Sequence, residues 1–349
     1  MDQGKLDQLL GKVMGDFAGG VNMMLVRIGE QTGLFRALAE GTATSGELAK
    51  RSGTAERYVR EWLSAMAAAG YVTYNGDGRF SMAPEQVAVF AVEDTPAYMP
   101  AFTDTFVSMV HDEPKVTNAF RSGKGIPWGD RHQCLFCGTE RFFRPGYAAF
   151  LVDQWLPALE GVVEKLKAGA KVADIGCGHG SSTILMAKAF PKSNFTGFDF
   201  HPSSVEAARA HAKEAGINNA TFEVAAAKSY PGRDYDLVAI FDALHDMGDP
   251  VGAARHVCAT LRPGGTFMVV EPLAGDRLED NLHTLGALFY GASTMICTPA
   301  SLAQEVGLAL GAQAGEAKLA GVLKEGGFKQ VRRAAQTLTN LVLEARALS

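Results

Sequence analysis

The stretch Lys171-Val172-Ala173-Asp174-Ile175, followed at once by Gly176-Cys177-Gly178-His179-Gly180, decides the fold of this 349-residue chain. The first five residues have the apolar character of a buried strand, and Ser181-Ser182-Thr183 then opens a helix. Glycines at such a junction permit a tight turn and let a ligand approach the backbone where the amides of a helix N-terminus are free. The sequence therefore predicts a cofactor site on this turn.

Short apolar strands alternate with helices on both sides of the turn, a texture typical of a parallel α/β sheet. The predicted strands are 171–175, 194–198, 220–224, 236–241 and 266–271, with an edge hairpin near 330–334 and 338–344. We therefore expect an α/β domain with a seven-stranded, Rossmann-like sheet.

Two carboxylates narrow the choice of cofactor. Asp199 ends the strand after the turn, about 20 residues on, where a ribose diol needs an acceptor. That feature also fits a dinucleotide, so a nicotinamide-dependent oxidoreductase is one alternative. Asp174, directly before the glycines, is awkward for a pyrophosphate but suits an uncharged nucleoside and a cationic amino group.

The pattern Asp-x-Gly-x-Gly-x-Gly at 174–180 resembles motif I of class I S-adenosylmethionine (SAM)-dependent methyltransferases, and the resemblance continues through 198–200, 235–238 and 261–265. It implies S-adenosyl-L-methionine as the cofactor. The residues implied in its site are Gly176, Gly178 and Gly180 around methionine and ribose, Asp199 on the ribose hydroxyls and Phe200 beside adenine. One departure is Ala226, which stands where family members often carry an acidic residue that contacts the adenine amine.

The segment 241–249 follows the fourth strand and resembles the Leu-His-Asp-Trp-x-Asp segment of plant-type and polyketide-tailoring O-methyltransferases, which also carry a winged-helix dimerisation domain in front. The resemblance implies that His245 is the general base and that Asp246 or Glu271 orients it. An imidazole with an ordinary pKa near 6.5 can take a phenolic proton at neutral pH. Alternatively, His245 only forms a local hydrogen bond, but the carboxyl end of a central strand favours a ligand crevice. We also assign Phe241 and Asp242, at the same strand end, to the cofactor site.

Two further segments, 138–147 and 244–250, are similar to a bacterial group of two-domain methyltransferases of largely unassigned substrate. Within the first, Arg144 and Tyr147 either touch the cofactor carboxylate or fasten their helix to the sheet, and both interpretations stay open. Just before it, Cys134 and Cys137 have redox or metal spacing, yet no second such pair exists, so packing is favoured and no metal is expected.

The N-terminal third predicts a winged helix-turn-helix. The spacing of apolar residues predicts helices over 6–17 and 24–35. A capping box at 44–47 predicts the start of a third helix, and Thr54 is expected to cap a fourth that runs to about Ala69. Residues 71–82 are expected to form a β-hairpin. Arg57 and Arg60 would face DNA, but interspersed glutamates dilute their charge. Dimerisation is therefore favoured over DNA binding, and the exposed apolar helices suggest a homodimer.

The expected domains are residues 1–100 (helical and winged-helix dimerisation domain), 101–140 (linker or hinge) and 141–349 (methyltransferase domain). The formal net charge of -5 predicts that the protein does not bind nucleic acid. The sequence has no run of 18 apolar residues, so no membrane partner is expected. The N-terminus has no signal-peptide core, and we expect a cytoplasmic protein. The expected activity is methyl transfer from SAM to a small apolar or aromatic acceptor. Oxygen is the favoured acceptor atom, and sulfur, nitrogen and carbon are the alternatives. A SAM-responsive transcription regulator is the rival from another class.

Overall fold

The computed structural model describes residues 1–93 and 95–347 and divides into two compact units. The first unit comprises Met1–Val107 and Cys137–Pro145, and the second comprises Ser108–Phe136 and Gly146–Ser349. Much of the stretch 101–140, expected as a linker, is helical, since α6 spans Phe102–Ser122 and α7 begins at Cys134. Pro114 inside α6 and the glycines after it conceal this helix in the sequence. The domain limits themselves stay a prediction.

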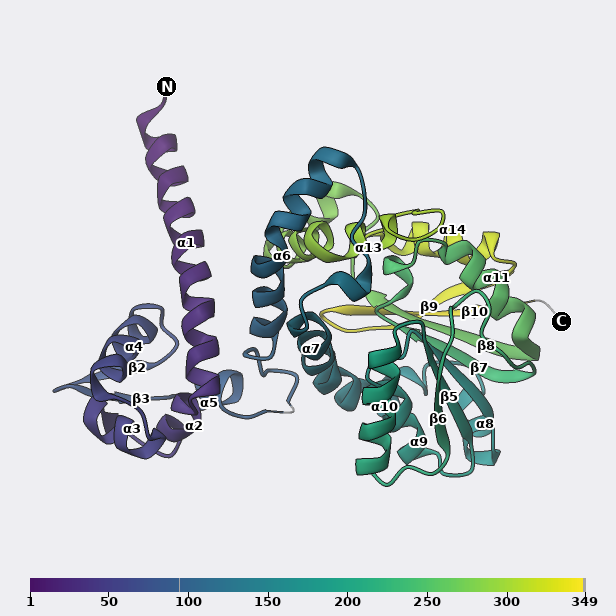
Figure 1. Cartoon of the computed structure of the whole chain (residues 1–349), viewed down its shortest axis with the longest axis horizontal. Helices are drawn as coiled ribbons and strands as arrows, with labels where there is room; N and C mark the ends of the chain where they lie inside the picture. Colours follow the sequence, from purple (N-terminus) through teal and green to yellow (C-terminus); the bar gives the residue numbers. More distant parts are fainter. Residues whose placement is uncertain (94, 348–349) are drawn as a thin grey trace. The chain divides into compact units, whose positions relative to one another are not determined.

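The first unit contains the predicted winged helix (Figure 1). Its elements are α1 (Gln3–Gln31), α2 (Leu34–Ala39), α3 (Ser45–Ser52), α4 (Glu56–Ala68) and α5 (Pro84–Phe90), with a small sheet of β1 (Ala43–Thr44), β2 (Thr73–Gly76) and β3 (Arg79–Ser81) in the order β1-β3-β2. The capping box at Thr44 and Glu47 forms as predicted. Its core gathers Phe35, Trp62 and Phe90, whose rings stack or meet edge to face.

Two details of the N-terminal prediction are wrong. Residues 6–17 and 24–31, expected in two helices, form one continuous helix, α1, because Gly19 and Gly20 keep helical geometry. The break comes only at Gly33, with φ of +71°, and residues 34–35 begin α2. Thr54 does not cap α4, whose N-cap is Ala55. The Thr54 hydroxyl is instead 2.7 Å from that of Ser52 in the turn between α3 and α4.

Helix continuity also changes the membrane analysis. Two helical segments, Gln3–Gln31 and Thr284–Leu302, are long and apolar enough to cross a membrane by length and composition alone. The second contributes buried residues such as Ile296 to its unit, as a core helix of a globular protein does. In the first, residues 3–18 are nearly all exposed, and the rest of the helix is partly buried, with Val26 and Gly29 fully so.

The second unit is built on a seven-stranded sheet in the order β6-β5-β4-β7-β8-β10-β9 (Figure 1). Its strands are β4 (Lys171–Ile175), β5 (Asn194–Asp199), β6 (Ala220–Val224), β7 (Tyr235–Phe241), β8 (Leu261–Pro272), β9 (Gln330–Gln336) and β10 (Asn340–Arg346). The first five are parallel, and β10 runs antiparallel to both β8 and β9. All seven predicted strands are present, and β8 begins five residues earlier than expected.

Helices cover both faces of this sheet. Those in contact with its strands are α8 (Val162–Ala168), α9 (Ser181–Ala189), α10 (Pro202–Glu214), α11 (Pro250–Thr260) and α14 (Glu316–Glu325). The remaining helices are α7 (Cys134–Phe150), α12 (Thr284–Ala292) and α13 (Thr298–Leu302). Alternation along the strands sends Ile175, Phe198 and Ile240 into the core with α11 and α14, and the opposite face packs on α10. The parallel strand ends therefore meet at one edge, where a ligand crevice is expected.

Gly197 lets the cofactor turn lie close to the sheet, so its substitution is a test of this packing. In Gly197→Ala the new Cβ would lie 2.6 Å from Cδ1 of Phe222 and 2.9 Å from Sγ of Cys177. We expect the variant to lose about 1–3 kcal/mol of stability through overpacking, measured by urea unfolding. Gly321→Ala is the control, because its Cβ meets nothing within 4 Å at an exposed position of α14, and it should gain about 0.5–1 kcal/mol. Equal midpoints for the two variants would contradict the packing described.

Candidate functional site

The glycine turn after β4 has the geometry that its sequence predicts. Gly176, Gly178 and Gly180 have φ values of +69°, +52° and +83°, the left-handed region that favours glycine. The backbone N–H groups of Gly176 and Cys177 donate to the carbonyl of Phe198, at 2.7 and 3.1 Å, which anchors the turn to β5. A Cβ built on Gly178 would meet nothing within 4 Å. The turn therefore presents open space beside its backbone, directly before α9.

Asp174 is buried beneath the turn with one oxygen satisfied and one not. Its Oδ2 accepts hydrogen bonds from the hydroxyls of Ser182 and Thr183, both at 2.6 Å. Its Oδ1 is buried and has no hydrogen-bond partner. Burial raises the pKa of Asp174 to about 6, against the two hydroxyl hydrogen bonds that lower it. An orphaned buried carboxylate oxygen is costly, so this position is suited to a ligand that donates hydrogen bonds or carries positive charge.

Asp199 lies at the end of β5 and accepts two backbone hydrogen bonds, from Gly178 N–H at 2.9 Å and His201 N–H at 2.8 Å. Burial raises its pKa. Each carboxylate oxygen keeps a second lone pair for a ligand hydroxyl. Phe200, the next residue, is 51% exposed, so its ring is available to a flat ligand. Ala226 is also exposed and supplies no acidic side chain.

A half-buried carboxylate with its own hydrogen-bond network, Asp242, follows β7. Asp242, with φ of +48°, accepts hydrogen bonds from the Tyr147 hydroxyl and from the Asn340 side-chain amide, both at 2.7 Å. Burial, and then the charge of Glu271, raise the pKa of Asp242 to about 7. Tyr147 also packs on Phe241, with ring centroids 5.3 Å apart. The structure therefore brings three of the predicted site residues, Tyr147, Phe241 and Asp242, into one cluster.

Arg144 belongs to the first unit, where its Nε lies 3.7 Å from a carboxylate oxygen of Glu140. Its predicted contact with the cofactor stays a prediction. Cys134 and Cys137 both lie in α7 and are thiols, the first half-buried and the second exposed.

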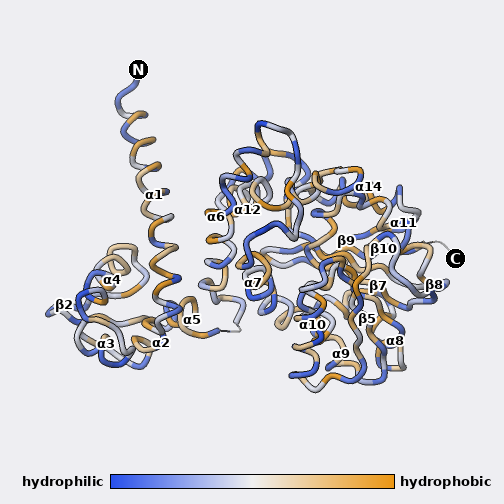
Figure 2. The backbone as a smooth tube through the Cα atoms, in the orientation of Figure 1, coloured by the Kyte–Doolittle hydropathy of each residue, from blue (hydrophilic) through white to orange (hydrophobic). Residues whose placement is uncertain are grey.

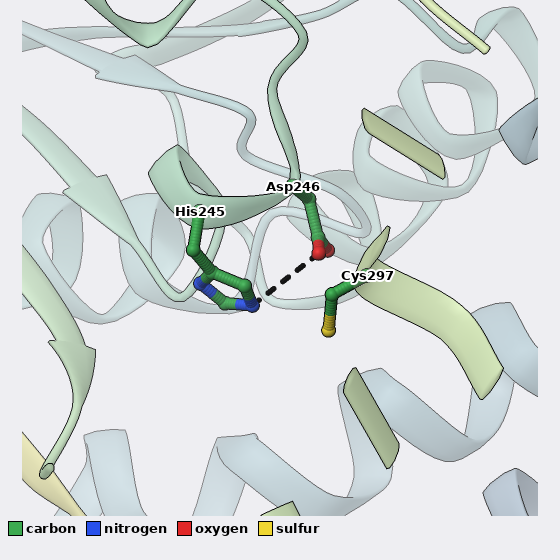
Figure 3. Close-up of side chains that lie close together, drawn as sticks. All are labelled: His245, Asp246 and Cys297. Carbon is green, nitrogen blue, oxygen red and sulfur yellow. Dashed lines mark ion pairs between the residues drawn. The ribbon is translucent and has the colours of Figure 1, made fainter. Parts of the chain in front are cut away.

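His245 is held from both sides by the two acids that the sequence proposed. It lies in a 3-10 turn, Leu244–Asp246, and its Nδ1 is 2.5 Å from Oε2 of Glu271 on β8. Oε1 of the same carboxylate accepts the N–H of Leu244 at 2.9 Å, so Glu271 fixes both the turn and the ring. The Nε2 atom lies 3.3 Å from Oδ1 of Asp246 (Figure 3). Burial alone would lower the pKa of His245, but Glu271 and Asp246 outweigh it and raise that pKa.

Cys297 is the site residue that sequence reasoning did not single out. It lies in a π-helical turn, Ser293–Cys297, and its sulfur faces the same space as His245 Nε2 and the Asp246 carboxylate (Figure 3). Burial raises the pKa of its thiol to about 11. Cys297 thus places the turn Ser293–Cys297 next to the histidine. A sequence signal for that contact was absent because 52 residues of chain separate the two side chains.

An apolar cluster continues from Cys297 away from the histidine. Its buried members are Leu135, Ile296, Cys297 and Ala312, with Met109, Trp128 and Met295 packed against them. Arg131 borders the cluster, buried, and donates to the carbonyl of Ile296 at 3.3 Å. The side of His245 that faces Cys297 is therefore mainly apolar.

Two known domain families match the chain. Residues 166–327 match a family described as "Methyltransferase domain", and residues 20–92 match an "Rv2258c-like winged HTH domain". The chain contains a methyltransferase domain. The predicted order, a winged helix followed by a seven-stranded methyltransferase domain, is confirmed.

Curated relatives share part of this domain. The 27-O-demethylrifamycin SV methyltransferase of Amycolatopsis mediterranei is 36% identical over 118 residues, which is 32% of this chain and 43% of that protein. The ubiquinone biosynthesis O-methyltransferase of Methylobacterium sp. (strain 4-46) is 35% identical over 104 residues, 29% of this chain and 40% of that protein. The chain thus spans less than half the length of these two relatives.

Solved structures match the whole chain in fold. The mitomycin 7-O-methyltransferase superposes with a TM-score of 0.71 at 18% identity, over 99% of this chain and 100% of that one. Human N-acetylserotonin methyltransferase, solved in complex with SAM, gives 0.71 at 16% identity, over 97% and 98%. At these identities the likeness shows the fold, which is the one predicted from the sequence resemblance.

Proposed function

We propose that the protein transfers a methyl group from S-adenosyl-L-methionine to a small, apolar or aromatic acceptor, at oxygen, with His245 as the base. The observation that carries the proposal is the orphaned Oδ1 of Asp174 beside the open glycine turn. SAM carries a positively charged ammonium group and a positively charged sulfonium. This carboxylate attracts both, whereas it would repel a negatively charged pyrophosphate. The matched methyltransferase domain and the solved relative bound to SAM support the same cofactor.

The residues present fit that cofactor. Asp174 and the turn would hold its amino acid part, Asp199 would accept from its ribose hydroxyls, and the exposed ring of Phe200 would lie against its adenine. Asp242, fixed by two hydrogen bonds, adds negative charge at the adjoining strand end. When bound, SAM supplies a methyl group already activated by its sulfonium. The chain's own task is then to align the acceptor and remove its proton, and alignment alone contributes about 7–11 kcal/mol in comparable reactions.

His245 is placed to remove that proton. Glu271 accepts from Nδ1–H, which fixes the tautomer in which Nε2 has the free lone pair. Nε2 must be unprotonated to act, and the carboxylates favour its protonation. A cationic ligand at the same strand edge opposes that preference, because it stabilises the carboxylates without a proton on the ring. The apolar cluster beyond Cys297 favours an apolar or aromatic acceptor.

The winged helix is better suited to assembly than to DNA. Three of its exposed arginines are each paired with a glutamate: Arg57 with Glu61 at 2.6 Å, Arg60 with Glu56 at 2.6 Å, and Arg79 with Glu47 at 3.1 Å. A fourth, Arg51, donates to the backbone carbonyls of Gly41 and Thr42. Guanidinium groups already engaged in this way offer little net charge to a phosphate backbone. The regulator alternative therefore has less support than the enzyme.

We further infer a homodimer in the cytoplasm, formed through α1. Residues 1–18 are nearly all exposed, and apolar residues recur at the spacing of one helix face: Leu10, Val13, Met14, Phe17 and Val21. Along the backbone of α1, hydrophobic and hydrophilic residues accordingly alternate (Figure 2). Pairs such as Lys12 with Asp16 lie on the polar side. Helices in proteins gain most of their stability by packing an apolar face against a partner surface, and a second α1 supplies a matching face.

The cofactor assignment predicts a pH-dependent thermal shift. SAM and S-adenosylhomocysteine should raise the Tm, and NADH should not. Asp174 must be ionised to attract the ammonium, and its folded pKa is about 6, so the apparent affinity should rise about tenfold from pH 5 to pH 7. The apo protein itself loses stability as pH rises through that pKa, so shifts are measured against apo protein at each pH. Asp174→Asn should flatten the dependence. Stabilisation by NADH alone would overturn the assignment.

The base assignment predicts a separation of binding from turnover. His245→Ala should lower methyl transfer from labelled SAM to a panel of small phenols by about 10²–10⁴-fold, and the SAM-induced Tm shift should persist. His111→Ala is the control, since that side chain is 60% exposed. Full turnover by His245→Ala would rule out the base role.

The dimer predicts that a charge on the apolar face of α1 separates the subunits. Phe17→Glu should give a monomer in light scattering at concentrations where the parent chain is a dimer, and Lys12→Glu on the polar side should not. If the parent chain is monomeric, or binds lipid vesicles through α1, the homodimer proposal fails.

A further inference from the structure

Three chemically different electron-pair donors meet at the buried end of the site. His245 Nε2, the Asp246 carboxylate and Cys297 Sγ all lie within 4.8 Å of one another (Figure 3). His245 and Cys297 are buried, and Asp246 is half-buried. They come from two short turns far apart in the chain, Leu244–Asp246 and Ser293–Cys297.

The geometry leaves this space short of positive charge. Because Nδ1 is taken by Glu271 at 2.5 Å, neutral His245 turns the bare lone pair of Nε2 toward Asp246. Oδ1 of Asp246, 3.3 Å away, is itself buried and has no hydrogen-bond partner. Two lone pairs facing each other in a poorly solvated place repel, so a proton or a metal cation must lie between them. The thiol beside them is a third donor, and a single proton does not use it.

We propose that His245 Nε2, the Asp246 carboxylate and the Cys297 thiolate form a three-ligand site for a zinc-type transition metal ion. Nitrogen, oxygen and sulfur together suit Zn²⁺, whereas Mg²⁺ and Ca²⁺ prefer oxygen ligands. Three protein ligands leave the fourth tetrahedral position open. Glu271 on the other ring nitrogen is the carboxylate partner that metal-binding histidines usually have.

Charge is balanced with the metal bound. The ion and the buried Arg131 guanidinium bring three positive charges, and Asp246, Glu271 and the Cys297 thiolate bring three negative ones. Arg131 lies 4.0 Å from the buried carboxylate of Asp112, which also pairs with Lys115. Binding releases the thiol proton to solvent, together with any proton held between Nε2 and Asp246.

The metal and the base function exclude each other, because both use the lone pair of Nε2. On the proposed function, Zn²⁺ therefore inhibits methyl transfer in competition with the acceptor, and the cofactor still binds. A metal ion bound at this site would therefore prevent His245 from acting as the base.

The test is metal binding by the full chain, first stripped of metal with a chelator. Zn²⁺ titrated against a chromophoric chelator should bind at one equivalent per chain, and Co²⁺ should give a thiolate-to-cobalt charge-transfer band in the near ultraviolet. Cys297→Ser should abolish the band. Glu271→Gln should weaken binding by about 10–100-fold, as expected for the partner of a ligand histidine.

Cysteines outside the cluster provide the controls, and Cys137→Ser and Cys258→Ser should retain the band in full. Circular dichroism shows whether each variant is folded. If Cys297→Ser is not folded, Asp246→Asn takes its place as the ligand variant. No binding by the parent chain, or an unchanged band in Cys297→Ser, overturns the proposal. These titrations need neither acceptor nor SAM, so their failure leaves the proposed function intact. A chain that binds zinc but not SAM would refute the proposed function alone.

Discussion

Carboxylates at the ends of four neighbouring strands, three of them buried and Asp242 half-buried, are the constraint on which the site depends. Asp174, Asp199, Asp242 and Glu271 belong to or directly follow β4, β5, β7 and β8, which are adjacent in the sheet. Each is hydrogen-bonded, yet burial still raises the pKa of the first three. Such an edge disfavours anionic ligands and favours cationic ones. The selection of a sulfonium nucleoside over a dinucleotide is thus a property of the strand ends as a group, beyond the glycine turn itself.

The parts of this arrangement that are local in sequence could be predicted. The strand at 171–175 and its turn were predicted with their bounds, because an apolar run followed by closely spaced glycines has few other conformations. The family resemblance implied Asp246 or Glu271 as the partner of His245. The structure places Glu271 there because β8, which carries it, lies beside β7, which precedes the turn of His245. The strand order thus allows a hydrogen bond between two residues that are 26 positions apart in the sequence.

Contacts set by tertiary packing could not be predicted. Cys297 reaches the histidine from a π-helical turn, and in sequence the stretch around it is indistinguishable from ordinary core helix. Asn340 reaches Asp242 only because β10 pairs antiparallel with β8. The N-terminal helix was divided in two because glycine lowers helix propensity by about 1 kcal/mol relative to alanine. That cost does not break α1, which is continuous through Gly19 and Gly20.

His245 links the strand-end carboxylates to the acceptor side, and its protonation depends on what else neutralises them. With Glu271 on one side and Asp246 on the other, the ring holds a proton strongly when it is the nearest cation. A second positive charge at the strand edge stabilises the same carboxylates and makes the ring proton easier to lose. On the proposed function, the ring therefore becomes available as a base more readily once a cationic cofactor is in place. A metal ion at Nε2 would satisfy the carboxylates by the same means but would occupy the lone pair that the reaction needs.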